Sequence, residues 1–432
     1  MFAILIAITL TMLVAGLLKR GGYLQVPTLF AAVMAGWMLP QIWGLVFRQS
    51  APGNSLNTLL LMTILASLVT YLGWFMATRA KSDPLGGPLP RISDTHLEKA
   101  ALILTGIALV AFVGLRFAPE EQQVGFVWTG QSTILYFILN LKTASFALSL
   151  ILLLKKRTPF SLALFAVNIL MFIPFVLFMF KRRHLVEVVL IAAYAMLLIK
   201  NFAIPRAVVA AGFAIASIGV FATAELRSTT VDEELPDFEK IAEIDFLALS
   251  PIYDPQASPE VENAAHLIHT MQITGDYTYG QYTWNRFVFQ YVPGQLVGFD
   301  VKQQLMTDAW PDEVVYRAVR YEGHPGSTQT GIGTAYMELA FLGLLFFFIP
   351  AYFMGFLWRR ALAGNYWDKI WYAVGLVPLL HGITHHSAYF FVAFTMFIVA
   401  LGFVALCLRI DYGARAKNQT RRSRQRRRQF AR

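Results

Sequence analysis

The sequence predicts an all-α polytopic membrane protein with about eleven transmembrane helices and one large loop on the outer side of the membrane. The composition is the first observation, because 56% of the 432 residues are hydrophobic and only 14% are charged. Soluble domains carry about 25% charged residues. The mean hydropathy is +0.54, and many apolar runs reach the roughly 17–25 residues that a helix needs to cross a bilayer.

Eleven apolar segments account for this prediction. Backbone polar groups in lipid must be satisfied internally, so each segment is expected to be a helix. The segments are residues 2–18, 24–47, 56–78, 100–116, 134–154, 160–180, 185–199, 207–224, 334–358, 370–386 and 388–409. The first one lacks a basic n-region and a small-residue cleavage site, so we expect a retained helix rather than a signal peptide.

Four parts follow from this division. Eight helices occupy residues 1–224, a large loop with short helices occupies 225–333, three helices occupy 334–409, and a basic tail occupies 410–432. The net charge is +10, and the stretch Arg415–Arg432 holds nine Lys or Arg and no acid. Beside a last helix, such a tail is expected to stay in the cytoplasm near anionic lipid rather than to bind nucleic acid.

The basic loops predict the orientation of the chain. Cytoplasmic loops of membrane proteins are enriched in Lys and Arg. Counting back from the tail places five basic groups in the cytoplasm, namely Lys19–Arg20, Arg79 to Lys99, Lys155–Arg157, Lys200 with Arg206, and Arg359 to Lys369. The N-terminus and the large loop are then expected on the outer side of the membrane.

One basic group contradicts this rule. Lys181, Arg182, Arg183 and His184 fall on the outer side. Either the count is wrong there, for example because of a re-entrant segment, or the group binds an anion, since charges that defy the insertion bias often mark a site. Guanidinium groups bind phosphate in a bidentate manner, so a lipid-linked pyrophosphate is the expected anion.

The large loop has two halves of different character. The first half is acidic, and residues 231–253 are expected to form an amphipathic helix near the surface. The second half mixes Gly with aromatic residues, among them Tyr279, Tyr282 and Trp284. These rings could stack on sugars or belong to an interfacial aromatic belt.

Three further arginines could serve the same outer surface. Arg317 and Arg320 share a face if their segment is helical, and Arg286 adds a third cation. They could clamp phosphates or pair with the acidic half of the loop. The single cysteine, Cys407, excludes a disulfide within the chain and a cysteine metal site.

The end of the loop carries candidate proton acceptors. The stretch "YEGHPGSTQTGIG" is Gly-rich but lacks the Lys of a Walker motif, which argues against nucleotide hydrolysis. Glu322 and His324 are candidates to deprotonate a hydroxyl. Glu338 is either such a base or the partner of an arginine, because a buried acid is costly unless it is used or paired.

Three histidines follow the tenth segment. His381 and His385 have the i, i+4 spacing of zinc ligands, but no HExxH motif is present, so no metal is expected and a hydrogen-bonding or interfacial role is favoured. Lys142 and Arg116 could add positive charge to the outer half of the membrane region, or extend towards the interface.

Two stretches and the basic group resemble the Wzy-type O-antigen or oligosaccharide repeat-unit polymerases. "YGQYTWNRFVFQYVPGQL" is similar to the "G-x-x-Y … I-P-R" region of that family. "GSTQTGIGTAYMELAFLGLL", which contains Tyr336, is similar to its "G-x-x-Y-x-x-F-G-x-x-G" region. Gly294 stands where the family often has Arg, and the Phe-Gly pair is shifted to Phe341 and Gly343.

The resemblance implies a GT-C-like glycosyltransferase of the bacterial inner membrane. Such enzymes take undecaprenyl-pyrophosphate-linked oligosaccharides and polymerise the repeat units at the periplasmic face, without nucleotide sugar or metal cofactor, and a chain-length regulator protein is an expected partner. We expect the basic group to bind the pyrophosphate, with Arg286, Arg317 and Arg320 contributing, and Tyr279, Tyr282, Trp284 and Tyr336 to bind the glycan. An O-antigen ligase, which transfers the same donor to lipid A–core, and a flippase or scaffold without chemistry remain alternatives.

Overall fold

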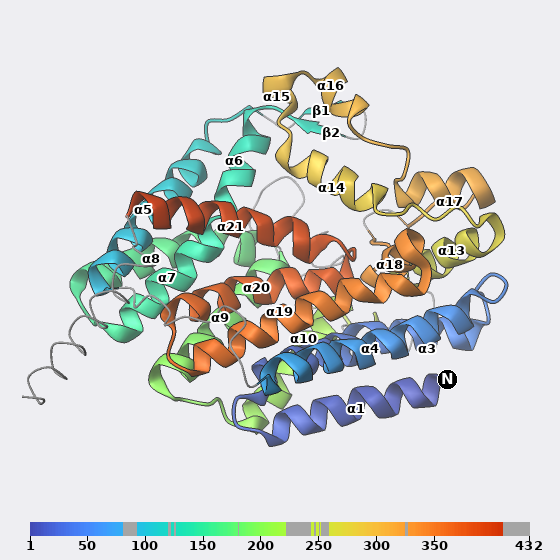
Figure 1. Cartoon of the computed structure of the whole chain (residues 1–432), viewed down its shortest axis with the longest axis horizontal. Coiled ribbons are helices and arrows are strands. Elements are labelled where there is room, and N and C mark those ends of the chain that lie inside the picture. The colour runs from blue at the N-terminus through green and yellow to red at the C-terminus, as the bar shows by residue number, and fades with distance from the viewer. Residues whose placement is uncertain are drawn as a thin grey trace, which may run out of the picture.

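Long helices running side by side form the body of the computed structural model (Figure 1). The structure describes residues 1–80, 93–119, 122–124, 127–179, 181–221, 243–245, 248–249, 251, 259–324 and 327–408. The expected amphipathic helix within 231–253 falls almost entirely outside these residues, and the basic tail lies wholly outside them.

The first half of the chain contributes ten helices and a small hairpin. The helices are α1 (Phe2–Leu18), α2 (Val26–Val33), α3 (Leu39–Arg48), α4 (Ser55–Arg79), α5 (Asp94–Gly114), α6 (Gln131–Leu139), α7 (Lys142–Lys155), α8 (Pro159–Ile173), α9 (Arg182–Lys200) and α10 (Arg206–Phe221). Strands β1 (Gln122–Val124) and β2 (Val127–Thr129) pair antiparallel between α5 and α6, where no strand was expected.

The second half alternates short loop helices with long apolar ones. The loop helices are α13 (Pro259–Thr274), α14 (Gln281–Tyr291), α15 (Gly294–Val297), α16 (Phe299–Gln304) and α17 (Pro311–Val319). They are followed by α18 (Gly331–Leu339), α19 (Leu345–Leu362), α20 (Tyr366–Thr384) and α21 (Tyr389–Cys407).

Seven helical stretches among the described residues are long and apolar enough to cross a membrane. They are Val26–Arg48, Ser55–Arg79, Asp94–Gly114, Gln131–Lys155, Pro159–Phe178, Gly331–Leu362 and Tyr389–Cys407. α1 and the Arg206–Gly219 part of α10 are shorter apolar helices. The prediction of a polytopic helical membrane protein is therefore confirmed, while the count of eleven spans stays a prediction.

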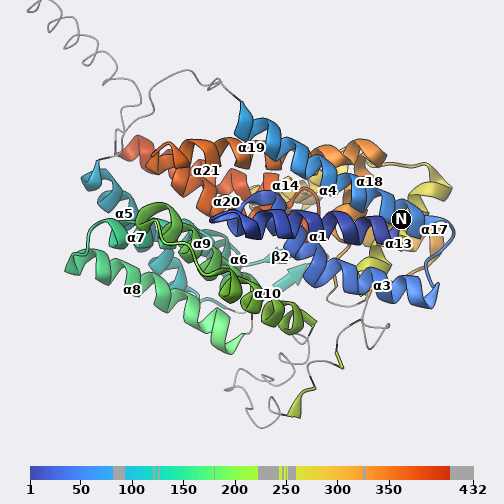
Figure 2. The ribbon, with the colours of Figure 1, turned by 90° about the horizontal axis from the view of Figure 1, so that it is seen from below.

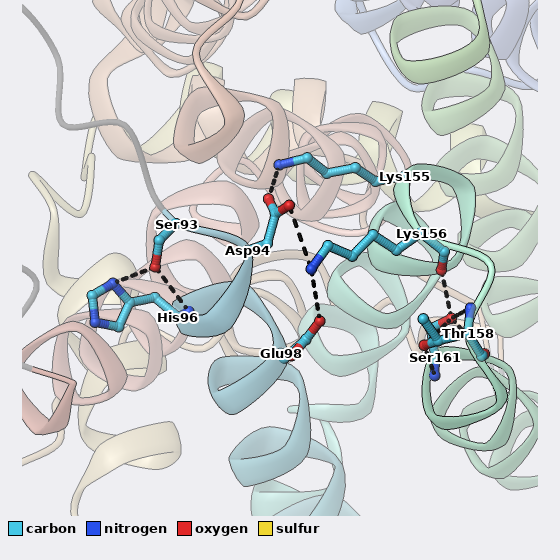
Figure 3. Close-up of polar contacts among 8 residues, drawn as sticks. All are labelled: Ser93, Asp94, His96, Glu98, Lys155, Lys156, Thr158 and Ser161. Atoms are coloured by element: carbon cyan, nitrogen blue, oxygen red, sulfur yellow. Dashed lines mark hydrogen bonds and ion pairs between the residues drawn. The ribbon is translucent and has the colours of Figure 1, made fainter.

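Basic and acidic side chains join α5 to α7 at one end of the bundle (Figure 3). Lys155 pairs with Asp94, and Nζ of Lys156 lies 3.5 Å from Asp94 and 3.3 Å from Glu98. The hydroxyl of Ser93 accepts a hydrogen bond from the backbone amide of His96 and so caps the start of α5. These contacts hold the first turn of one helix against the last turn of the other.

Other helix ends meet at the same end of the bundle. Nζ of Lys155 lies 4.2 Å from the ring centroid of Tyr366, which begins α20. Three basic side chains donate there to carbonyls at helix ends: Arg206 to Leu18, Arg359 to Ala80, and Lys369 to Leu198. We call this the basic end of the bundle.

Two long apolar stretches are interrupted. The stretch of α6 and α7 breaks at Asn140–Leu141, and the stretch of α18 and α19 breaks at Ala340, whose φ is 49°. Gly343 has no side chain because a Cβ there would lie 2.0 Å from the carbonyl oxygen of Ala335.

The break at the end of α18 is bridged by the large loop. The backbone amides of Thr278 and Tyr279 donate to the carbonyls of Met337 and Glu338, each at 3.0 Å. These carbonyls cannot be satisfied within α18, since the helix ends there. The loop backbone therefore completes the hydrogen bonding of a membrane helix.

The loop helix α13 is embedded in the bundle rather than laid over it. It packs against α3, α4, α17 and α18, and Figure 2 shows α13 and α17 at the end of the bundle where α3 terminates. Its buried side chains include Asn263, Leu267 and Ile268.

Candidate functional site

The basic group from Lys181 to His184 forms the start of α9. α8 begins beside Lys156 at the basic end, and α9 ends at Lys200, near the Lys369 contact with Leu198. Their connection therefore lies at the opposite end of the bundle from the other described basic groups. The conflict in the charge pattern is thus a feature of the fold as well as of the sequence.

Arg183 is held by side chains from three parts of the chain. Its Nε donates to Oε1 of Glu187 at 3.0 Å, Nη1 donates to the hydroxyl of Tyr389 at 3.0 Å, and Nη2 donates to Oδ1 of Asn140 at 3.3 Å. A guanidinium group has five N–H donors. Within the described ranges these three bonds orient the group and leave one N–H on each terminal nitrogen unused.

Glu187 neutralises part of the basic group. Its side chain is 1% exposed, and Oε2 lies 2.9 Å from Nδ1 of His184. An ionised carboxylate is costly to bury unless it is paired. The acid therefore serves to fix the orientation of Arg183 and His184.

Lys142 adds a buried cation from the first turn of α7. The residue is 2% exposed, and Nζ lies 4.5 Å from the ring centroid of Phe175. Among the described residues it makes no hydrogen bond or ion pair, although the charges of Glu187, Arg183 and Lys181 act on it. Nζ of Lys181 lies 5.5 Å from the same Phe175 ring.

The turn between α20 and α21 brings histidines to this place. The rings of His381, His385 and His386 lie 4.8, 5.7 and 5.1 Å from the ring of Tyr389, whose hydroxyl accepts from Arg183. Among the described residues, no group of His, Cys, Asp or Glu has the arrangement of a metal site.

Arg286 from the loop helix α14 completes the set. The positive charges of Arg183, Arg182 and Arg286 all act on His385. Lys142 on α7 and Lys181 at the start of α9 lie over the same Phe175 ring, and Arg286 on α14 is related to them through the shared neighbour His385. We call Lys142, Lys181, Arg182, Arg183 and Arg286 the cationic site.

The other two predicted arginines make different contacts. Arg317 donates to the carbonyl of Asp308, and its terminal nitrogens lie 3.9 Å from the carboxylate of Asp308 and 3.7 Å from that of Glu313. α17 ends at Val319, and Arg320 has a φ of 56°. The expectation that Arg317 and Arg320 share one helical face is therefore wrong.

Glu338 caps a neighbouring helix. It is fully buried, and Oε1 accepts from the backbone amide (2.6 Å) and the hydroxyl (2.7 Å) of Thr283 in the first turn of α14. A carboxylate is favourable at a helix N-terminus. Oε2 has no hydrogen-bond partner among the described residues, and the side chain forms no ion pair with a described arginine.

His324 and Glu322 lie at the surface of the loop. Glu322 is exposed. Nε2 of His324 lies 3.5 Å from Oε2 of Glu262, which also lies 3.4 Å from Nη2 of Arg48. Neither candidate base makes a hydrogen bond or ion pair with the cationic site among the described residues.

A buried asparagine fastens this part of the loop to α13. Nδ2 of Asn263 donates to the hydroxyl of Ser327 (2.7 Å) and the carbonyl of Thr328 (3.3 Å). Oδ1 accepts from the hydroxyl of Tyr321 (2.9 Å) and the amide of His324 (3.4 Å). One side chain therefore anchors the Gly-rich stretch at four points.

Glu260 connects this region to the cationic site. Burial raises the pKa of the Glu260 carboxyl, while a hydrogen bond from Gln41 and the charges of Arg182 and His324 act to lower it. A carboxyl in such an environment is typical of a proton acceptor or donor. Neither Glu260 nor Glu187 was expected from the sequence, although the i, i+4 spacing of Arg183 and Glu187 was visible in "RRHLVE".

The predicted glycan-binding aromatics divide into two pairs. Tyr279 is 72% exposed and Trp284 is 53% exposed, so their rings are accessible. Tyr282 packs against Trp310 and His386, and Tyr336 packs against neighbouring aromatic rings. Burial raises the pKa of Tyr282 to about 12, so its hydroxyl stays protonated.

Comparisons with protein-family models, with curated proteins and with solved structures find no match for this chain.

Proposed function

We propose that this protein is a glycosyltransferase that polymerises lipid-pyrophosphate-linked oligosaccharide repeat units at the periplasmic face of a bacterial inner membrane. The observation that carries the proposal is the cationic site, which lies at the opposite end of the bundle from the basic end. By the positive-inside rule the basic end faces the cytoplasm. The cationic site and the N-terminus then face the periplasm, in an eleven-span, GT-C-like arrangement.

The site suits the release of a pyrophosphate. Attack of an acceptor hydroxyl on the anomeric carbon breaks the bond from that carbon to the pyrophosphate oxygen, inverts the configuration and leaves negative charge on the pyrophosphate. Fixed cations that face this developing charge stabilise the transition state. Arg183 is suited to this task because its two remaining donors are already oriented by Glu187, Tyr389 and Asn140.

The acceptor hydroxyl must lose a proton. In this proposal Glu260, a partly buried carboxyl in the first turn of α13, accepts the proton. The exposed rings of Tyr279 and Trp284 are placed to stack on the glycan. Glu338, His324 and Glu322 have no reacting role in this arrangement.

The test is deletion of the protein in its host, followed by gels of surface and lipid-linked glycans. Collapse of the polymer ladder to one repeat unit is the expected result. Complementation with Arg183→Ala or Arg286→Ala should leave the ladder collapsed, whereas Arg317→Ala, which removes a surface ion pair, should restore it. Long polymer that stays on its carrier lipid would instead indicate a ligase, and loss of repeat units from the outer leaflet would indicate a flippase.

A further inference from the structure

An apolar groove runs between α5 and α6 on the outside of the bundle. Its volume is about 530 Å³, and its lining side chains include Val110 and Ala111 from α5 and Leu135 and Ile138 from α6. All of its lining residues are apolar or glycine. Val110 is 71% exposed, so the groove opens away from the bundle, towards the hydrocarbon of a bilayer.

A small buried cluster lies between the groove and two lysines of the cationic site. Ala111, Leu139 and Phe175 form a small buried cluster, against which Leu135 and Ile138 pack. The Nζ atoms of Lys142 and Lys181 lie over the Phe175 ring, at 4.5 and 5.5 Å from its centroid. Phe175 therefore contacts both ammonium groups and packs in the cluster behind the groove-lining residues Ala111, Leu135 and Ile138.

This juxtaposition fits an amphiphile. A long hydrocarbon chain gains free energy in an apolar groove, although a lipid-facing groove in a bilayer is filled by ordinary acyl chains as well. The distinguishing feature is the neighbouring positive charge, which requires an anionic group on the same molecule. A phosphorylated lipid with one long tail supplies both a hydrocarbon chain for the groove and an anionic group for the cations.

We propose that the groove between α5 and α6 holds the isoprenoid tail of the lipid-pyrophosphate donor while the cationic site holds its pyrophosphate. This inference rests on the proposed function and adds a subsite to it. A phosphate-bearing isoprenoid spans the two features with a single molecule.

Gly106 allows the groove to be closed without disturbing the fold. It lines the groove from α5, and a Cβ atom at this position would meet nothing within 4 Å. Gly106→Phe therefore fills the groove with a ring, and removing a helix-interior glycine also favours the helix. Gly212 on α10 is an equally open glycine of another apolar helix, so Gly212→Phe is the matched control.

The probe is a polyprenyl monophosphate with a photoreactive diazirine at the far end of its tail. The purified full-length protein in nanodiscs is irradiated with it, and the labelled peptides are mapped by mass spectrometry. We expect label on α5 and α6, competition by unlabelled polyprenyl phosphate, and a loss of about tenfold in Gly106→Phe but not in Gly212→Phe. Equal labelling of both variants, or equal competition by phosphatidylglycerol, would overturn the inference.

A kinetic measurement separates this inference from the function on which it rests. Gly106→Phe should raise the KM for a donor with a full-length tail about tenfold and leave the KM for a two-isoprene donor unchanged. If the wild-type protein is active but Gly106→Phe changes the KM of both donors equally, the tail site is wrong and the transferase function stands. If the wild-type protein binds the probe in the groove but transfers no glycan, the tail site stands and the transferase function is wrong.

Discussion

Arg183 and Glu187 lie one turn apart on α9, and the Nε of the arginine donates to the carboxylate at 3.0 Å. The second carboxylate oxygen lies 2.9 Å from Nδ1 of His184. One acid thus sets the position of two neighbouring members of the basic group. A pair of this kind is usual within a helix, but here it also turns the guanidinium towards Tyr389 and Asn140.

Glu187→Gln tests whether this acid positions Arg183. The amide keeps the shape of the side chain but leaves the buried cations without their counter-charge, so we expect a loss of about 1–3 kcal/mol in stability and a collapsed polymer ladder. Thermal unfolding of the purified protein and complementation of the deletion strain measure the two effects. Val186→Ala, on the exposed side of α9, is the control, and an unchanged melting temperature with a full ladder would refute the role.

Glu338 can be tested with two substitutions. Glu338→Gln retains an oxygen that can accept from Thr283, so we expect a full polymer ladder. Glu338→Ala removes that oxygen and should cost about 1 kcal/mol of stability, the usual effect of losing a helix cap. If the Gln variant folds normally but makes no polymer, Glu338 acts in proton transfer rather than as a cap.

Asn263→Ala should release the Gly-rich part of the loop. Four hydrogen bonds to residues 321–328 depend on this side chain. Hydrogen exchange followed by mass spectrometry should therefore show faster exchange in peptides from this stretch. Ser327→Ala removes one of the four bonds and should change exchange much less, and equal behaviour of the two variants would contradict the anchoring role.

The raised pKa of Glu260 predicts that the stability of the protein depends on pH. Its pKa in the folded protein lies above the ordinary value of 4.5, so the folded state binds the proton more tightly than the unfolded state does. The resulting stability is present below pH 4.5 and is lost as the pH rises through the higher, folded-state pKa. We expect Glu260→Gln to match the wild type in melting temperature at pH 4 and to exceed it at pH 7.

The same variant separates stability from activity. As the proposed proton acceptor, Glu260 cannot be replaced by an amide, so the more stable Glu260→Gln protein should make no polymer. Gln41→Ala, which alters the neighbourhood of Glu260 without removing its carboxyl, serves as the control. Normal polymer from Glu260→Gln would exclude the acceptor role while leaving the pH argument intact.

The helices of the membrane region could be predicted from the sequence because lipid leaves the backbone little choice. Within the described part of the chain, each of the eleven apolar segments overlaps at least one helix. The interruption at Ala340 could not be predicted, since the apolar composition continues through it, and the polar residues Asn140 and Lys142 marked the other break without fixing its geometry. Arg320 in a left-handed conformation ends α17 without a glycine to announce it.

The cationic site could be predicted in part. The group from Lys181 to His184 was visible because its charge contradicts its expected side of the membrane. Glu187 follows on the same helix, but the partners Asn140 and Tyr389 come from distant parts of the chain, and their meeting with Arg183 depends on packing that one sequence does not display. Glu338 was visible as a buried acid, but its partner Thr283 is 55 residues away.

The two hydrogen bonds from Thr278 and Tyr279 to the end of α18 have a consequence for biogenesis. Thr278 and Tyr279 are synthesised before Met337 and Glu338, so the loop backbone is already present when the apolar stretch of α18 and α19 is inserted. The loop backbone then supplies the two amides that hydrogen-bond to the carbonyls at the end of α18. A soluble fragment containing only the loop would lack its partner, and a chain without the loop would insert a helix with open carbonyls in an apolar setting. The protein is therefore assembled as one unit, and circular permutants or split versions divided between residues 279 and 337 should fail at insertion rather than at catalysis.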